Sequence, residues 1–290
     1  MDIRTIAFSL AAAAIAATAS AQPTAQIIPL DLTGSRPAVS VSIGGAPPEL
    51  WVFDTGAMGA AINMDRARAL NLPEEQPVQL GSPAGGTPMQ GFFTTLSNAR
   101  VGDVALAPFQ IVAAPSLVPG RGGVMSPAVF SGKLLTLDFA QSQLRITDKS
   151  PATLPRGPAT PYEGARAGHA LPSISITING QTLHGHIDTG SPGALILPYA
   201  MAASLPLAAP AVQVGVAHFV DGVHPRYSAT LNGDVQVGPL TLHNPEIGFI
   251  DGLPTLNVGT QLLTQMTIVL DPAEQRSWAL ASPNAPESGH

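Results

Sequence analysis

The sequence predicts an all-β protein built from two lobes that are copies of one unit. Glycine and proline number 29 each in 290 residues, together about a fifth of the chain, where roughly an eighth is usual. Such a composition favours short strands and turns over long helices. Two further observations agree with this: one motif occurs twice at matched places, and each copy contains a segment in which apolar and polar residues alternate.

The internal repeat is the clearest sign of the organisation. The motif Asp54-Thr55-Gly56 reappears 134 residues later as Asp188-Thr189-Gly190, and each copy lies between two apolar segments. Further along, Leu137-Asp138 matches Leu270-Asp271 at an offset of 133 residues. This period is far longer than the roughly 20–50 residues of solenoid repeats. We therefore expect two copies of one small domain.

Composition sets the expected boundaries of these units. The divisions are a signal peptide at residues 1–21, a first lobe at 26–147, a connector at 148–168, a second lobe at 169–282 and a tail at 283–290. The connector contains four prolines and few apolar residues, which is typical of an extended linker.

Local patterns predict the elements inside each lobe. Val39-Ser40-Val41-Ser42-Ile43 and Ile174-Ser175-Ile176-Thr177-Ile178 alternate at period two, as strands with one buried face do. Asn179-Gly180 follows the second segment and predicts a two-residue hairpin turn. Short helices are expected at 64–70, 198–204 and 260–263.

The amino-terminal residues resemble a signal peptide. Arg4 precedes an apolar run over 6–17, and Ala19-Ser20-Ala21 offers the small residues that a signal peptidase reads. We expect cleavage after Ala21 and export to the periplasm or the medium, with no stable membrane insertion afterwards. A membrane anchor is the alternative, but the run is shorter than the roughly 20 residues of a comfortable span.

Charge and cysteine content narrow the function classes. The net charge is −6 with only 13 Lys and Arg, and no stretch forms the basic cluster that nucleic-acid binding requires. The chain has no cysteine, so in an oxidising compartment its stability comes from core burial alone. With 45% hydrophobic residues, a packed core is expected.

The paired aspartates point to a chemistry. A single Asp-Thr-Gly is often only a turn, since aspartate starts turns and glycine accepts a positive φ. Two copies at matched places suggest two carboxylates that share a proton. Cleavage of an amide by water needs a base for the water and an acid for the carbonyl and the nitrogen, and such a pair supplies both.

On these motifs the chain resembles the aspartic peptidase superfamily. Asp54-Thr55-Gly56-Ala57 is similar to the retropepsin signature, Asp188-Thr189-Gly190-Ser191 to the pepsin variant, and Leu256-Asn257-Val258-Gly259 to the later element of a lobe. The resemblance implies two pseudo-symmetric β-barrel lobes, a six-stranded interlobe platform and a cleft between the lobes. It also implies an endopeptidase with catalytic Asp54 and Asp188, a peptide or protein substrate, and no cofactor or metal.

The same resemblance assigns supporting roles. Thr55 and Thr189 would bond across the pseudo-two-fold axis, and Gly56 and Gly190 would let the two backbones approach closely. Ser191 completes the second loop. We further predict that the Ser191 hydroxyl donates to Asp188, which would make Asp188 the more acidic aspartate because alanine stands at the matching place.

Three features depart from the family pattern. Ser126 stands where the first lobe should have glycine, and Asn257 stands where the second lobe should have an apolar residue. The flap candidate at 81–91 has Gly85 and Gly86 at its tip and Met89 behind it, but no tyrosine. Val220-Asp221-Gly222 marks a second candidate, although a glycine-bearing surface hairpin needs no function.

Other functions remain open on the sequence alone. His184, His186 and Asp188 alternate along one predicted strand and could begin a metal site of a hydrolase. The same fold could instead bind extended peptides without cutting them. Each lobe could also pair with another chain, but the connector and the matched loops favour closure within one monomer. By analogy, apolar residues are expected beside the scissile bond.

Overall fold

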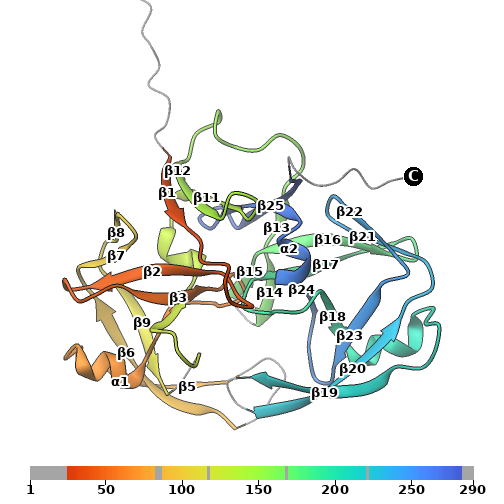
Figure 1. The fold of residues 1–290 in the computed structure, drawn as a ribbon, viewed down its shortest axis with the longest axis horizontal. Helices are drawn as coiled ribbons and strands as arrows, with labels where there is room; N and C mark the ends of the chain where they lie inside the picture. Colours follow the sequence, from red (N-terminus) through yellow and green to blue (C-terminus); the bar gives the residue numbers. More distant parts are fainter. Residues whose placement is uncertain (1–24, 82–86, 116–117, 167–168, 220–221, 283–290) are drawn as a thin grey trace, which may run out of the picture.

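The computed structural model describes residues 25–81, 87–115, 118–166, 169–219 and 222–282. It consists mostly of strands, arranged as one large sheet in each lobe, a third sheet that lies across both lobes, and a small two-stranded sheet (Figure 1). The predicted all-β, two-lobed fold is therefore confirmed. The expected signal peptide and the expected tail lie outside the described residues. Within the described part of the chain, no helix has the length and apolar character to cross a membrane.

The first lobe contains one nine-stranded sheet with the order β5-β6-β9-β4-β10-β3-β2-β7-β8. Its strands are β2 (Ala38–Ile43), β3 (Glu49–Phe53), β4 (Ala61–Asn63), β5 (Gln76–Leu80), β6 (Met89–Leu96), β7 (Ala99–Val101), β8 (Val104–Ala105), β9 (Phe109–Ala114) and β10 (Gly123–Met125). The helix α1 (Met64–Ala69) and the 3₁₀ helix η1 (Pro127–Phe130) complete it.

The second lobe repeats this sheet strand for strand, with the order β19-β20-β23-β18-β24-β17-β16-β21-β22. Its strands are β16 (Ser173–Ile178), β17 (Gln181–Asp188), β18 (Leu195–Pro198), β19 (Val212–Phe219), β20 (Gly222–Thr230), β21 (Asp234–Val237), β22 (Leu240–His243), β23 (Glu246–Ile250) and β24 (Leu256–Gly259). The helices are η2 (Tyr199–Ser204) and α2 (Thr260–Leu263).

A six-stranded platform joins the lobes. Its strands, in spatial order, are β1 (Gln26–Pro29), β12 (Gln143–Asp148), β11 (Lys133–Asp138), β25 (Met266–Asp271), β26 (Arg276–Ala281) and β13 (Thr160–Pro161). The two halves of the chain meet where β11 pairs antiparallel with β25. The family resemblance implied such a platform.

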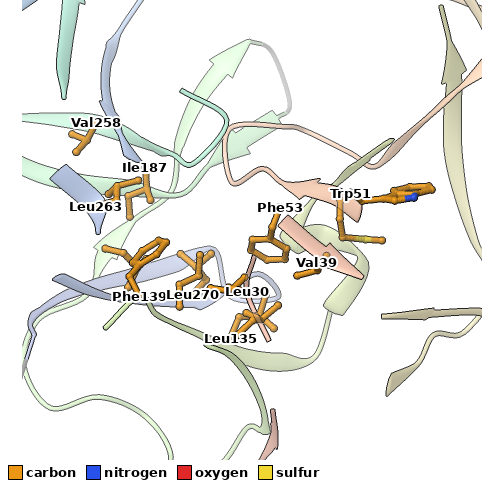
Figure 2. Packing of buried hydrophobic residues seen from close by; sticks show 14 of the residues in the cluster. Leu30, Val39, Trp51, Phe53, Leu135, Phe139, Ile187, Val258, Leu263 and Leu270 are labelled. Carbon is orange, nitrogen blue, oxygen red and sulfur yellow. The ribbon is translucent and has the colours of Figure 1, made fainter. Parts of the chain in front are cut away.

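The platform also packs against the strands that lead into the two Asp-Thr-Gly loops. Leu135 and Leu270, which are register partners at the centre of the platform, are fully buried. Figure 2 shows them on the platform side of Phe53 and Ile187, the residues that directly precede the two aspartates. Phe53 and Ile187 are themselves fully buried and belong to the same apolar cluster. Burial of this apolar surface holds both loops in a fixed position relative to the platform.

The local predictions from sequence hold in most places. The alternating segments form β2 and β16, and Asn179 and Gly180 have φ values of 50° and 75°, as a type I′ hairpin turn requires. Helices occur at all three expected places. The helix η1 was not predicted, although Ser126 accepts a hydrogen bond from Ala128 N and a proline follows it, which is a recognisable helix start.

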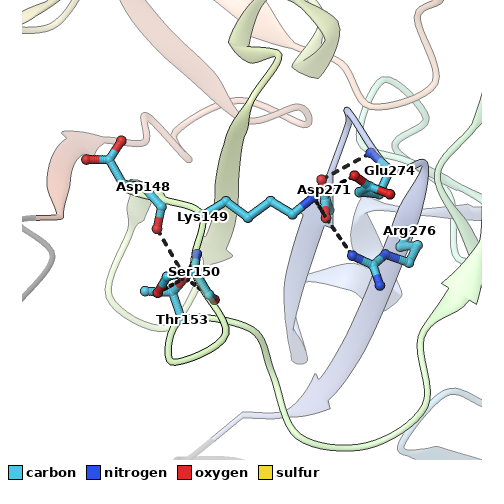
Figure 3. Close-up of polar contacts among 7 residues, drawn as sticks. All are labelled: Asp148, Lys149, Ser150, Thr153, Asp271, Glu274 and Arg276. Atoms are coloured by element: carbon cyan, nitrogen blue, oxygen red, sulfur yellow. Dashed lines mark hydrogen bonds and ion pairs between the residues drawn. The ribbon is translucent and has the colours of Figure 1, made fainter.

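The connector is more structured than an extended linker. It contains β13 and the strand β14 (Glu163–Arg166), which forms a hairpin with β15 (His169–Leu171). Lys149 binds Asp271 at 2.9 Å and Glu274 at 3.1 Å (Figure 3). Burial alone would raise the pKa of Asp271, but hydrogen bonds from Lys149, the Glu274 N–H and Arg276 hold it below its usual value. The connector is thereby attached to the platform.

Candidate active site

The two Asp-Thr-Gly loops meet at the interface of the lobes. Asp54 follows β3, and Asp188 ends β17, the matching strand of the second lobe. A methyl group added at Gly56 would lie 2.6 Å from Asp188 Oδ1, and one added at Gly190 would lie 2.4 Å from Asp54 Oδ2. Only glycine therefore lets each loop pass so close to the opposite carboxyl group.

The two threonines lock the loops together, as the resemblance implied. Thr55 Oγ1 donates to Ile187 O at 2.6 Å, and Thr189 Oγ1 donates to Phe53 O at 2.5 Å. Each hydroxyl also accepts the backbone N–H of the other threonine at 3.0 Å. Both threonines are 0% exposed. These four interlobe bonds leave each loop little freedom to move relative to the other.

The environment of the aspartates raises both pKa values. Burial raises the pKa of Asp54. Hydrogen bonds from Gly56 N–H and other backbone donors, and the positive charge of Arg36, lower it, but burial has the larger effect. Burial and then the negative charge of Asp54 raise the pKa of Asp188 to about 7. Because two carboxyl groups this close do not both ionise at low free-energy cost, the pair holds one proton between them over part of the pH range.

The donor group of Ser191 in the structure differs from the predicted one. The prediction assumed that a serine hydroxyl would hold Asp188 in its charged form. In the structure, the contact from Ser191 to Asp188 comes from its backbone N–H, and the backbone N–H of Ala57 makes the matching contact to Asp54. The contacts of Ser191 and Ala57 therefore do not distinguish the two loops.

Asn257 does distinguish the two Asp-Thr-Gly loops. Its Nδ2 donates to Asp188 Oδ2 at 2.6 Å. In the first lobe the matching position is Val124, since Val124 pairs with Val52 on β3 as Asn257 pairs with His186 on β17. The sequence showed that Asn257 replaces an apolar residue, but the contact itself depends on the register of β24 against β17.

Arg36 is a second residue that sequence reasoning missed. Its Nε donates to Gly190 O at 2.5 Å, across the lobe boundary. Its positive charge lowers the pKa of both aspartates against the effect of burial. The matching residue of the second lobe is Leu171, because Pro37 O and Pro172 O accept equivalent bonds from Phe53 N and Ile187 N. No motif in the sequence marks Arg36.

Ser126 keeps the first loop in place despite its departure from glycine. Its buried hydroxyl donates to Ala57 O at 2.8 Å. In the second lobe the matching carbonyl, Ser191 O, accepts bonds from Thr260 N at 2.8 Å and Thr260 Oγ1 at 2.7 Å. Gly259 could not be replaced by serine there, because a Cβ would lie 2.3 Å from Gly193 O. Each lobe thus supports its loop with a different side-chain donor.

The flap candidates lie on two matching hairpins. Gly85 and Gly86 lie outside the described residues, whereas Met89 begins β6 and pairs with Leu80 on β5. In the second lobe β19 and β20 form the equivalent hairpin, of which Gly222 is described. Both hairpins lie at the edge of their sheets.

The histidines near Asp188 are placed differently from a metal site. His184 Nδ1 pairs with Glu163, and the Nε2 atom of His186 is buried with no hydrogen-bond partner among the described residues. Burial lowers the pKa of His186. Within the described ranges, no three His, Cys, Asp or Glu side chains are placed to share a metal ion.

A cavity of about 250 Å³ lies beside the first loop. Its lining includes Ala57 and Met58 from the loop, and Leu171 and Pro172 from the segment that enters the second lobe. The cavity thus spans the boundary between the lobes, contacts Thr55 next to Asp54, and has a lining of mixed polar and apolar character.

Comparison with known proteins agrees with this geometry. The sequence profile of the family described as aspartyl protease matches residues 39–134 and 174–266, one match in each lobe. Each match contains one Asp-Thr-Gly motif. No curated protein matches the chain. The profile covers more than half of the sequence and includes both loops, so the chain belongs to the aspartyl protease family.

Proposed function

We propose that the protein is an aspartic endopeptidase that hydrolyses peptide bonds with a water molecule activated between Asp54 and Asp188. The observation that carries this proposal is the packing of each carboxyl group against the glycine of the opposite loop. Two carboxyl groups held this close cannot both be charged at low free-energy cost, so they retain one proton between them. An acid and a base next to each other are what amide hydrolysis needs.

The proposed chemistry needs one charged and one protonated aspartate, and we propose Asp54 as the charged one. Asp54 takes a proton from water as the water oxygen attacks the carbonyl carbon, and Asp188 gives its proton to the carbonyl oxygen. A neutral tetrahedral diol results, with the proton now on Asp54. Asp54 then protonates the nitrogen, the C–N bond breaks, and one diol hydroxyl returns its proton to Asp188. The products are a carboxylic acid and an amine, and the dyad regains its starting charge.

The test is cleavage of a diverse peptide library by the full chain between pH 3 and pH 8, beside Asp54→Asn and Asp188→Asn. We expect the wild type to cut and each single variant to be inactive while keeping its circular dichroism spectrum. Loss of only one variant's activity would contradict a shared-proton dyad. A folded wild type that cuts nothing at any pH would favour a peptide-binding module instead.

We also propose that the protein is exported and acts as a monomer. The apolar leader before residue 22 supports export, and the supply of both aspartates by one chain supports a monomer. Cell fractionation and the intact mass of the exported protein should give an amino terminus at Gln22. Sedimentation should give the mass of a single chain, that is, the 290 residues without the leader. A cytoplasmic protein with its leader intact, or a stable dimer, would contradict these proposals.

A further inference from the structure

The two loops of the dyad are closely matched, but their surroundings are not. The reciprocal threonine bonds and the reciprocal glycine contacts follow the pseudo-two-fold axis. A symmetric dyad gives no reason for one aspartate to hold the proton rather than the other. The residues that break the symmetry must therefore lie next to the loops.

Asn257 makes the direct side-chain contact that breaks it. Because Asn257 is on β24, which runs parallel to β17, its register partner is His186 and its amide reaches Asp188 two residues further along β17. The amide contacts Oδ2 of Asp188, whereas Oδ1 is the oxygen nearest to the position of a Cβ at Gly56. The two oxygens of Asp188 therefore have different surroundings. At the matching position, Val124 has no polar group to offer Asp54.

The charged and titratable groups around Asp188 are few. Asp54 faces it from the first loop, Arg36 from the segment before β2, and His186 precedes it by two residues on β17. His186 is 4% exposed, and burial lowers its pKa, which favours the neutral form. Arg36 acts on both aspartates, so its charge alone does not select an oxygen of Asp188.

A protonated carboxyl group has one oxygen that accepts and one that carries the hydrogen. The amide N–H of Asn257 needs an acceptor, so it selects Oδ2 as the carbonyl oxygen and leaves the proton on Oδ1. When Asp188 gives that proton away, Oδ2 becomes part of a carboxylate and its bond to the amide becomes charge-assisted and stronger. An interaction that strengthens as the proton leaves lowers the barrier to its transfer.

We propose that Asn257 is a positioning residue, which holds Oδ2 of Asp188 and so leaves Oδ1 as the oxygen that carries and transfers the proton. This inference rests on the proposed peptidase function and extends it, because it makes two aspartates in nearly equivalent loops chemically different. It also gives a reason for an amide at a place where the matching strand has valine.

The test compares Asn257→Leu with Asn257→Gln. Leucine keeps the size of asparagine without a donor, and glutamine keeps the amide on a longer arm. Val124→Leu is the matched control, since it adds the same side chain at the equivalent strand position beside Asp54. For each variant, kcat, KM and the pH dependence of kcat/KM are measured on one peptide that the wild type cuts.

We expect Asn257→Leu to lower kcat about 10- to 100-fold with KM within about twofold of wild type, as loss of one hydrogen bond to a charged group implies. The basic limb of its kcat/KM profile should move to higher pH. Without the amide donor, the carboxylate form of Asp188 is less favoured and the pKa of Asp188 rises. Asn257→Gln should recover part of kcat, and Val124→Leu should keep the basic limb of wild type.

The inference is overturned if Asn257→Leu keeps the kcat and the basic limb of wild type. In that case inactive Asp54→Asn and Asp188→Asn variants would leave the proposed function standing. A rise in KM alone would show that Asn257 contacts substrate rather than positioning Asp188, and would also overturn it. If Asn257→Leu does not fold, the smaller Asn257→Ala, which also lacks a donor, replaces it, and an unmoved basic limb in that variant would count against the inference.

Discussion

Replacement of Thr189 by valine should weaken the contact between the lobes by a predictable amount. Valine has nearly the shape of threonine, so the change removes a hydroxyl group and little else. Two bonds are lost: the one from Thr189 Oγ1 to Phe53 O at 2.5 Å and the one from Thr55 N to Thr189 Oγ1 at 3.0 Å. Both partners lie at a buried interface, because Thr55 and Phe53 are 0% exposed.

The expected magnitude follows from the two groups that lose their partner. An unsatisfied buried donor or acceptor costs about 1–3 kcal/mol, so Thr189→Val should lower the free energy of unfolding by about 2–6 kcal/mol. That is a large share of the roughly 5–15 kcal/mol by which proteins are stable. The alternative Thr189→Ser keeps the hydroxyl and removes one methyl group, which should cost only about 1 kcal/mol.

Urea unfolding, followed by tryptophan fluorescence and circular dichroism, measures the difference. The midpoint of the valine variant should fall well below that of the serine variant, with the slope against urea unchanged. Peptidase activity should fall with it, because the same bonds hold the two loops in register. A valine variant as stable as the serine variant would refute the reasoning, since the hydroxyl would then contribute nothing to the contact between the lobes.

Three further predictions follow from the site. Gly190→Ala places a methyl group 2.4 Å from Asp54 Oδ2, so kcat should fall at least about 100-fold, and a near-normal kcat in steady-state assays would contradict the close approach. The pKa of Asp188 is raised from 3.8 to about 7; its stabilising contribution is therefore complete below about pH 4 and is lost as the pH rises through about 7. The free energy of unfolding in urea, measured at several pH values, should decline with pH in the wild type and decline less in Asp188→Asn. An equal pH dependence in the two proteins would contradict this prediction. Ser126→Ala removes the donor to Ala57 O at 2.8 Å and the cap of Ala128 N. The free energy of unfolding should therefore fall by about 1–3 kcal/mol. An unchanged urea midpoint would show that the hydroxyl is dispensable.

The features predicted best from the sequence were those encoded twice. A repeated Asp-Thr-Gly motif predicts the fold and the meeting of the two loops, because two equal units that pack about an axis bring the same residues together. The alternating segments and Asn179-Gly180 are local signals, and such signals fix β2, β16 and the turn after β16 without reference to the rest of the chain.

The features that the sequence did not reveal depend on contacts between distant segments. Arg36 reaches Gly190 across 154 residues, and Asn257 reaches Asp188 through the register of two parallel strands. The prediction for Ser191 named its hydroxyl as the donor to Asp188, whereas the contact in the structure comes from its backbone N–H. A hydroxyl group close to a carboxyl group in sequence is only one possible donor, and the backbone offers another.

The strand order of the platform has a consequence for the history and the modularity of the chain. From the outer edge inward, each half contributes a short edge strand and then a hairpin, β1 with β12 and β11 in one half, and β13 with β26 and β25 in the other. Each half therefore carries a complete building block, and the pairing of β11 with β25 is a contact that two separate polypeptides could make equally well. The covalent link at 149–159 raises the effective concentration of one half around the other. This is the architecture of two linked copies of one unit, and because both copies lie on one chain they need not be identical: valine lies beside Asp54 in one and asparagine beside Asp188 in the other.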